Sequence, residues 1–259
     1  MNRFDKTRVR NTRYTSTTLS LLSAGLIVLF ATGCTADPCN DLEPEALPSS
    51  CLEPTQDEAY YVAKGEAYFD TMDSDVNWEG EPNYSELVAR WEWPPWLKLT
   101  AYTRENILAT DALLHLYPST VPERDCRFFD QQPFARCRVT FYYADHDGQP
   151  CPIYEEFTFN DAGEMTFIEA WSDLPGMLPM DAELDPWAEG DEVSRLSTRI
   201  PGLGSADGRI DLDSPSMVEA AAADPDIDDF VVRAKDWYAT WSEELELAGD
   251  DLWQRGCGW

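Results

Sequence analysis

Positive charge and histidine are scarce in this sequence. Its 259 residues include 19 Lys and Arg against 49 Asp and Glu, with a formal net charge of −30 at pH 7 and only two His. A surface of this sign repels the phosphates of DNA and RNA and the headgroups of anionic lipids. Nucleic-acid partners and polybasic membrane docking are therefore excluded.

Motifs for metals, phosphates and covalent catalysis are missing as well. The chain has no CxxC pair, no phosphate-binding glycine loop, and no Ser or Cys nucleophile grouped with a base. A structural zinc site needs several Cys or His ligands at characteristic spacings, which the two His and the scattered Cys do not provide. We therefore expect no metal and no cofactor.

No apolar run is long enough for a comfortable membrane span. The longest covers roughly residues 19–30 and follows a leader in which Arg and Lys are frequent. A short apolar core behind a basic leader is typical of a signal peptide. The core ends in small residues and then a cysteine, in the order Ala31-Thr32-Gly33-Cys34.

This junction resembles the lipobox of bacterial lipoproteins, in which the cysteine thiol takes a diacylglycerol before the signal is cut. The resemblance implies a signal peptide over residues 1–33 and a lipid on Cys34, so that the partner of this end of the chain is a bilayer. Thr35 rather than Asp follows the cysteine, which by analogy favours the outer membrane of the cell envelope, on its periplasmic or surface face. An ordinary secretory signal cut near Ala36 is the alternative.

Six further cysteines make an even number, which in an exported protein predicts disulfides. They are Cys39, Cys51, Cys126, Cys137, Cys151 and Cys257. Composition alone allows many pairings. Proximity favours Cys39–Cys51, and a hairpin centred near Gln131 places Cys126 opposite Cys137. Cys151–Cys257 then remains and would attach the tail to the sheet.

The rest of the chain divides into three regions by composition and period. An acidic, Pro-rich tether is expected at 34–58, a folded domain at 59–175, and a C-terminal extension with a Trp-rich helix at 176–259. Thr55 and Glu58 have the spacing of a capping box, which predicts that a helix follows and continues to about Met72. A second helix is expected at 104–117. Alternating stretches predict strands of an antiparallel meander at about 122–129, 136–144, 152–160 and 164–172.

Helices followed by a curved antiparallel meander resemble the NTF2-like superfamily, which includes SnoaL-like cyclases and ketosteroid isomerases. The resemblance is carried by "VPERDCRFF" after the helix "RENILATDALLHLY", and above all by "YEEFTFNDAGEMTFIEAWSD". It implies an α+β fold in which the sheet wraps around the helices as a cone, with a partly helical C-terminal extension outside it. The concave face of such a cone holds an apolar pocket, and some members form homodimers. Because members catalyse, bind or assemble, the fold leaves the function open.

Glu155 is a carboxylate among apolar neighbours in this meander. Pairing Tyr143 with Cys151 puts Val139 opposite Glu155, and Arg138 opposite Glu156 on the other face. The first face then carries only apolar or aromatic groups besides Glu155, namely Val139, Phe141, Tyr143, Ile153, Phe157 and Phe159. We therefore expect Glu155 to face the pocket.

The turn after Phe159 decides which residues of the next strand join Glu155. A three-residue loop at 161–163 puts Glu169 opposite Glu155, with Phe167 and Trp171 on the same face, and we prefer it because it gathers apolar groups. A four-residue loop starting at Asn160 puts Ile168 and Ala170 there instead.

A buried carboxyl without a partner tends to keep its proton. Ketosteroid isomerases use such an acid to hydrogen-bond a carbonyl or enolate oxygen, and aligning the last hairpin puts Glu155 near that position. Tyr143 would add a phenol, and Glu92 is the best candidate for a base. Alternatively, Glu155 bonds Tyr143, an Arg or a backbone group and has only a structural role.

The leading hypothesis is a membrane-anchored lipoprotein that holds a small apolar ligand. The expected ligand contacts are Tyr143, Phe157, Glu169 and Trp171, with Glu155 as the only catalytic candidate. The rival hypotheses are an isomerase, cyclase or dehydratase that uses Glu155 as acid, and a scaffold without catalysis.

Replacing Cys34 with Ala should release the protein from membranes or leave an uncleaved precursor, because the lipid and the cleavage both depend on the thiol. Membrane fractionation and intact mass measure the two effects. An unchanged fractionation together with an unchanged mass would contradict the lipid anchor.

Overall fold

The computed structural model describes most of the chain from Cys39 onward. The described residues are 39–77, 82–93, 99–114, 118–174, 176–177, 185, 187, 193, 195–248 and 256–259. The signal peptide expected at 1–33 and the lipidation candidate Cys34 lie outside them. Within the described part, no helix combines the length and the apolarity that crossing a bilayer requires.

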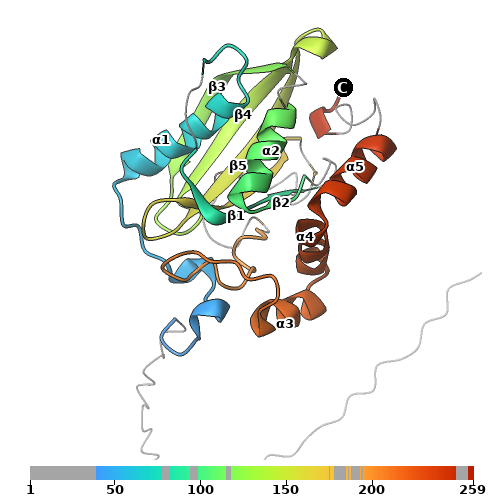
Figure 1. Cartoon of the computed structure of the whole chain (residues 1–259). Helices are drawn as coiled ribbons and strands as arrows, with labels where there is room; N and C mark the ends of the chain where they lie inside the picture. The colour runs from blue at the N-terminus through green and yellow to red at the C-terminus, as the bar shows by residue number, and fades with distance from the viewer. Residues whose placement is uncertain are drawn as a thin grey trace, which may run out of the picture. The chain divides into compact units, whose positions relative to one another are not determined.

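The described residues form an α+β fold with one six-stranded sheet and five α-helices (Figure 1). The strands are β1 Tyr84–Glu92, β2 Ala101–Tyr102, β3 Ser119–Phe128, β4 Ala135–Tyr143, β5 Gln149–Phe159 and β6 Met165–Ser172. The helices are α1 Glu58–Tyr68, α2 Arg104–Leu114, α3 Pro215–Ala223, α4 Pro225–Lys235 and α5 Trp237–Ala248. Short 3-10 turns occur at η1 Pro44–Ala46, η2 Ser49–Cys51, η3 Phe69–Thr71 and η4 Ala144–His146.

The antiparallel meander is confirmed for β3 to β6, whose neighbours pair in chain order. The strand order is β2-β1-β6-β5-β4-β3, and β1 runs parallel to β6. The first helix is capped by Asp57 and not by the expected Thr55, because the Asp57 side chain accepts a hydrogen bond from the Tyr60 N–H, and it ends at Tyr68 before the expected Met72. This cap satisfies one of the free N–H groups at the helix start.

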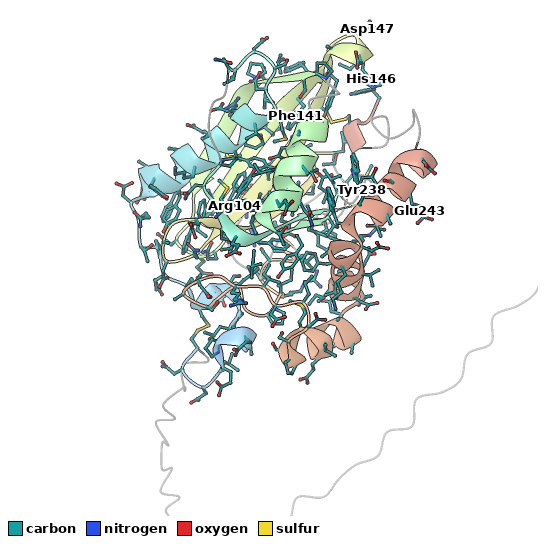
Figure 2. All side chains as sticks on the ribbon, in the orientation of Figure 1. Arg104, Phe141, His146, Asp147, Tyr238 and Glu243 are labelled. Carbon is teal, nitrogen blue, oxygen red and sulfur yellow. A yellow bond between two sulfur atoms is a disulfide. The ribbon has the colours of Figure 1, made fainter. Side chains whose placement is uncertain are left out.

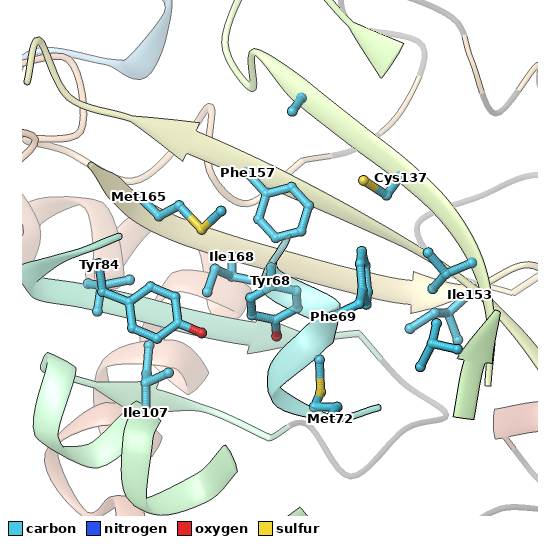
Figure 3. Packing of buried hydrophobic residues seen from close by; sticks show 14 of the residues in the cluster. Tyr68, Phe69, Met72, Tyr84, Ile107, Cys137, Ile153, Phe157, Met165 and Ile168 are labelled. Atoms are coloured by element: carbon cyan, nitrogen blue, oxygen red, sulfur yellow. The ribbon is translucent and has the colours of Figure 1, made fainter. Parts of the chain in front are cut away.

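Both faces of the sheet are covered by other parts of the chain. The inner face, as we call it, packs against α1 and α2, and Figure 3 shows Phe157, Ile168 and Tyr68 gathered in this apolar cluster. The outer face packs against residues 195–212, α3 and α4, and it contributes Trp91, Phe167 and Trp171 to a second apolar cluster, which includes Leu196, Ile200, Met217 and Phe230. Consequently, every residue of β5 from 153 to 159 is buried.

The β4–β5 register differs by two residues from the expected one. Tyr143 pairs with Gln149 and Cys137 with Glu155, because β5 begins at Gln149 and the connection is correspondingly short. A shift of two residues keeps each side chain on its face, since side chains alternate with period two. The expected inner-face group around Glu155 is therefore retained, although its pairs are not.

The β5–β6 pairing corrects the preferred faces of β6. At the turn the preferred loop is present, because Asn160 N–H bonds the Glu164 carbonyl and Phe159 pairs with Met165. A bulge then shifts the register by one residue, so that Glu155 pairs with Ala170 instead of Glu169. A one-residue bulge moves all following side chains to the opposite face. Glu169, Phe167 and Trp171 consequently lie on the outer face.

The three expected disulfides are present. Cys126 and Cys137 are direct cross-strand partners of β3 and β4, with a Cα–Cα distance of 4.0 Å. Cys39–Cys51 closes a small loop near the start of the described chain. Cys151–Cys257 connects residues 106 positions apart and attaches the C-terminal segment to β5.

Residues 39–58, assigned to the tether from the sequence, are folded against the domain. The Leu47 carbonyl accepts hydrogen bonds from the N–H groups of Gly202 and Gly204, both at 3.0 Å. A Cβ at Gly204 would lie 1.8 Å from the Pro48 carbonyl oxygen, so only glycine permits this approach. The described residues accordingly form one compact unit.

Candidate functional site

A row of inner-face residues brings two carboxyl groups close to each other. The registers align Glu92 of β1 with Ala170 of β6, and Ala170 with Glu155 of β5. Adjacent strands lie ~4.8 Å apart, so the two glutamate Cα atoms are separated by roughly 10 Å. The methyl group of Ala170 is the only side chain of the row between them, which leaves both carboxyls free to approach each other.

A buried ion pair stands beside these carboxyls. The Arg90 Nη2 lies 2.5 Å from the Asp111 Oδ1, and their side chains are 1% and 6% exposed. Asp111 comes from α2, and its other oxygen accepts a hydrogen bond from the Tyr84 hydroxyl at 3.2 Å. The Arg90 guanidinium also lies over the Tyr68 ring, 5.5 Å from its centroid. This pair fixes α2 to β1 and places a permanent cation on the inner face of the sheet.

Several hydrogen-bonding atoms of this cluster have no partner among the described residues. They are the Nε and Nη1 of Arg90 and the Oε2 of Glu155, all buried. A buried donor or acceptor left unpaired costs about 1–3 kcal/mol, and most buried polar atoms in proteins are satisfied. Unpaired atoms on two ionisable side chains at one place therefore call for a ligand, a proton or water as partner.

The carboxyls of this cluster hold their protons more tightly than usual. Burial raises the pKa of Glu155 to about 8, with Arg90 opposing this effect and Glu92 adding to it. Burial likewise raises the pKa of Glu92 to about 7, again opposed by Arg90. Glu92 is partly exposed whereas Glu155 is 4% exposed. Glu155, the deeper of the two carboxyls, therefore favours its protonated form.

Tyrosine hydroxyls surround the pair as further donors. Burial raises the pKa of Tyr68 well above its ordinary value, and the same holds for Tyr143, where the charges of Glu92 and Glu155 act in the same direction. Both phenols therefore stay protonated. Phe157 packs against these groups, with its ring centroid 5.0 Å from that of Tyr68.

The structure thus separates the residues expected to meet a ligand. Glu155, Tyr143 and Phe157 share the inner face, and Glu92 joins them. Glu169 lies on the outer face and accepts hydrogen bonds from Trp93 Nε1 at 2.5 Å and from the N–H groups of Leu196 and Ser197. These contacts give Glu169 a structural role.

Trp171 is also on the outer face, where its ring stacks on Tyr154 with centroids 5.7 Å apart. Glu156 does pair with an arginine, but its partners are Arg136 at 2.5 Å and Arg195 at 2.9 Å. The expected partner Arg138 instead binds Asp173 at 2.5 Å, a consequence of the two-residue register shift.

Sequence reasoning did not identify Arg90, Asp111 and Tyr68. A signal was present at the end of β1 and in the residue after it, where Arg90 and Glu92 alternate with Trp91 and Trp93. Bulky aromatic groups on one face and charges on the other indicate that a strand is covered on both sides. The charged face then has to be neutralised by another element, here α2.

Other site types receive no support from the described residues. Among the described residues, no group of three side chains is placed to hold a metal ion. Two pockets lined by described residues lie away from Glu155: one of about 280 Å³ beside Ser85, Asn160 and Arg209, and one of about 430 Å³ beside Glu123, Arg138 and Thr140. Both have charged rims and are open to solvent.

Comparison with known proteins adds no assignment. No protein-family model matches the chain, and no curated protein does. Any function therefore has to be argued from the contacts of the inner cluster, which we define as Glu92, Glu155, Arg90, Asp111 and Tyr68.

Glu155→Gln should be neutral at pH 4 and stabilising at pH 7 and above. The folded pKa lies above the unfolded value of ~4.3, so ionisation destabilises the wild type as pH rises from 4.3 towards 8. Glutamine keeps the shape and removes this titration. Denaturant melts of both proteins at both pH values measure the difference. A loss of stability at pH 7 that shrinks at pH 4 would instead identify Glu155 as an ionised partner of Arg90.

Proposed function

We propose that the chain is an exported, membrane-anchored lipoprotein whose NTF2-like domain binds a small, mainly apolar molecule at the inner cluster. The observation that carries this proposal is the set of unpaired buried atoms on Glu155 and Arg90 inside an aromatic interior. A ligand with one polar group would satisfy these atoms, while its apolar body would contact Tyr68, Tyr143 and Phe157.

The fold supports the NTF2-like part of the proposal. Helices α1 and α2 cover one face of a meander, as the resemblance implies. The polar groups of the inner cluster lie on that same face, where members of the superfamily hold their ligands. Glu92, which is partly exposed, marks the side from which solvent reaches the cluster.

An isomerase, cyclase or dehydratase is the second candidate, favoured by the two raised pKa values. A group that transfers protons works best when its pKa lies near the operating pH. Glu155, with a pKa of about 8, can donate a proton, and Glu92, with a pKa of about 7, can accept one. They stand on either side of Ala170, so a small substrate above Ala170 would contact both.

The probe 2-acetylnaphthalene tests binding and proton transfer together, because it has an apolar body, one carbonyl oxygen and exchangeable methyl protons. We expect calorimetry to show binding to the wild type and about tenfold weaker binding to Glu155→Gln, equivalent to ~1.4 kcal/mol. Glu164→Gln, at the β5–β6 turn, is the matched control and should bind as the wild type does.

The outcomes separate the candidates. No binding by the wild type, and no small molecule co-purifying with it in native mass spectrometry, would contradict a binding function. Equal binding by wild type and Glu155→Gln would show that the probe does not bind at the inner cluster. If the methyl protons of the probe exchange for deuterium in D₂O, and this exchange depends on Glu92, the result would establish the enzymatic function.

A further inference from the structure

The lipid anchor has very little free linker between it and the folded domain. Cys39 is held by its disulfide to Cys51, and η2 places Cys51 in the folded part. Five residue steps separate Cys34 from Cys39, and an extended chain spans at most ~3.6 Å per step, or about 18 Å. A diacylglycerol on Cys34 would thus keep Cys39 close to the headgroups.

The elements next to Cys39 form a fixed corner of the domain. We call residues 41–48 together with α3 the anchor corner. The Ser216 hydroxyl at the start of α3 donates a hydrogen bond to the Glu45 carbonyl at 2.6 Å. Since the Leu47 carbonyl is bound by Gly202 and Gly204 as well, the corner cannot swing away from the domain without breaking these bonds.

The anchor corner exposes apolar side chains that have no covering element in the described chain. Leu42 is 44% exposed and Val218 is 59% exposed. The corner also carries acidic side chains, at Asp41, Glu43, Glu45 and Glu219. Acidic groups repel anionic headgroups, so a bilayer in contact with this corner has to present neutral, zwitterionic headgroups.

We propose that the anchor corner rests on the surface of a zwitterionic bilayer, with Leu42 and Val218 at headgroup level. The proposal depends on the lipid on Cys34 that is part of the proposed function. In Figure 1 the corner and the C-terminus lie at opposite ends of the described unit, and in Figure 2 His146 and Asp147 mark that far end. The β4–β5 connection therefore faces away from the membrane.

Amide hydrogen exchange of the mature, lipidated protein tests this orientation. The protein is measured in phosphatidylcholine vesicles and in detergent, so that the anchor is present in both samples. In vesicles, we expect slower exchange in segments 41–48 and 215–223 and unchanged exchange in segment 144–148, which serves as the internal control.

A variant with a flexible Gly-Ser spacer inserted after Ala36 separates the effect of the short linker from the effect of the exposed surface. A spacer of about fifteen residues extends the reach by roughly 20 Å as a random coil, and we expect it to abolish the slowing while the protein still floats with vesicles. Slowing that persists with the spacer would contradict the claim that the short linker holds the corner at the bilayer surface.

Two results would count against parts of the account and are distinguishable. Vesicle-bound protein without slowing in the two segments, or with slowing at 144–148 instead, would overturn the orientation and leave the anchor intact. Protein that does not float with vesicles would contradict the lipid on Cys34, and with it the membrane part of the proposed function.

Discussion

Strand β5 is buried on both faces, and this constraint decides the chemistry of its two adjacent glutamates. Glu155 points to the inner face and Glu156 to the outer face, and they are 4% and 1% exposed. Glu156 is held by Arg136 and Arg195, whereas the nearest inner cation, Arg90, is paired with Asp111. Burial raises the pKa of both carboxyls to about 8. Arg136 opposes this effect at Glu156, to which it donates a hydrogen bond, whereas Glu155 keeps one oxygen without a partner and is neutralised by a proton.

The C-terminal extension creates this constraint by covering the outer face. Glu169 fixes this extension to the sheet by accepting hydrogen bonds from the N–H groups of Leu196 and Ser197. Without Glu169, these N–H groups would be buried and unpaired. Cys151–Cys257 attaches the end of the chain to the same strand that carries Glu155. Without this layer, one face of β5 would be wet, and Glu156 and Glu169 would need no buried partners. The tail is thus part of the core rather than an appendage.

Local patterns predicted α1, α2, the strands β3 to β6 and the disulfides, because alternation and hairpin proximity are local properties, but they did not predict β1 and β2 as strands. They did not predict how the strands align. The one-residue bulge that moves Glu169 and Trp171 to the outer face has no marker in the sequence, and it responds to packing on both sides of β6. The parallel pairing of β1 with β6 joins segments far apart in sequence, so Glu92 could be named as a base but not placed beside Ala170.

The central claim is that Glu155 is protonated at neutral pH in the folded protein. Side-chain ¹³C NMR of protein labelled at glutamate follows each carboxyl through a pH titration, and Glu155→Gln assigns the signal. The account predicts a Glu155 carboxyl that titrates near pH 8, because burial disfavours its charged form. A Glu155 signal that titrates at or below the ordinary value of ~4.3 would contradict the account, since it would show an ionised and fully paired side chain.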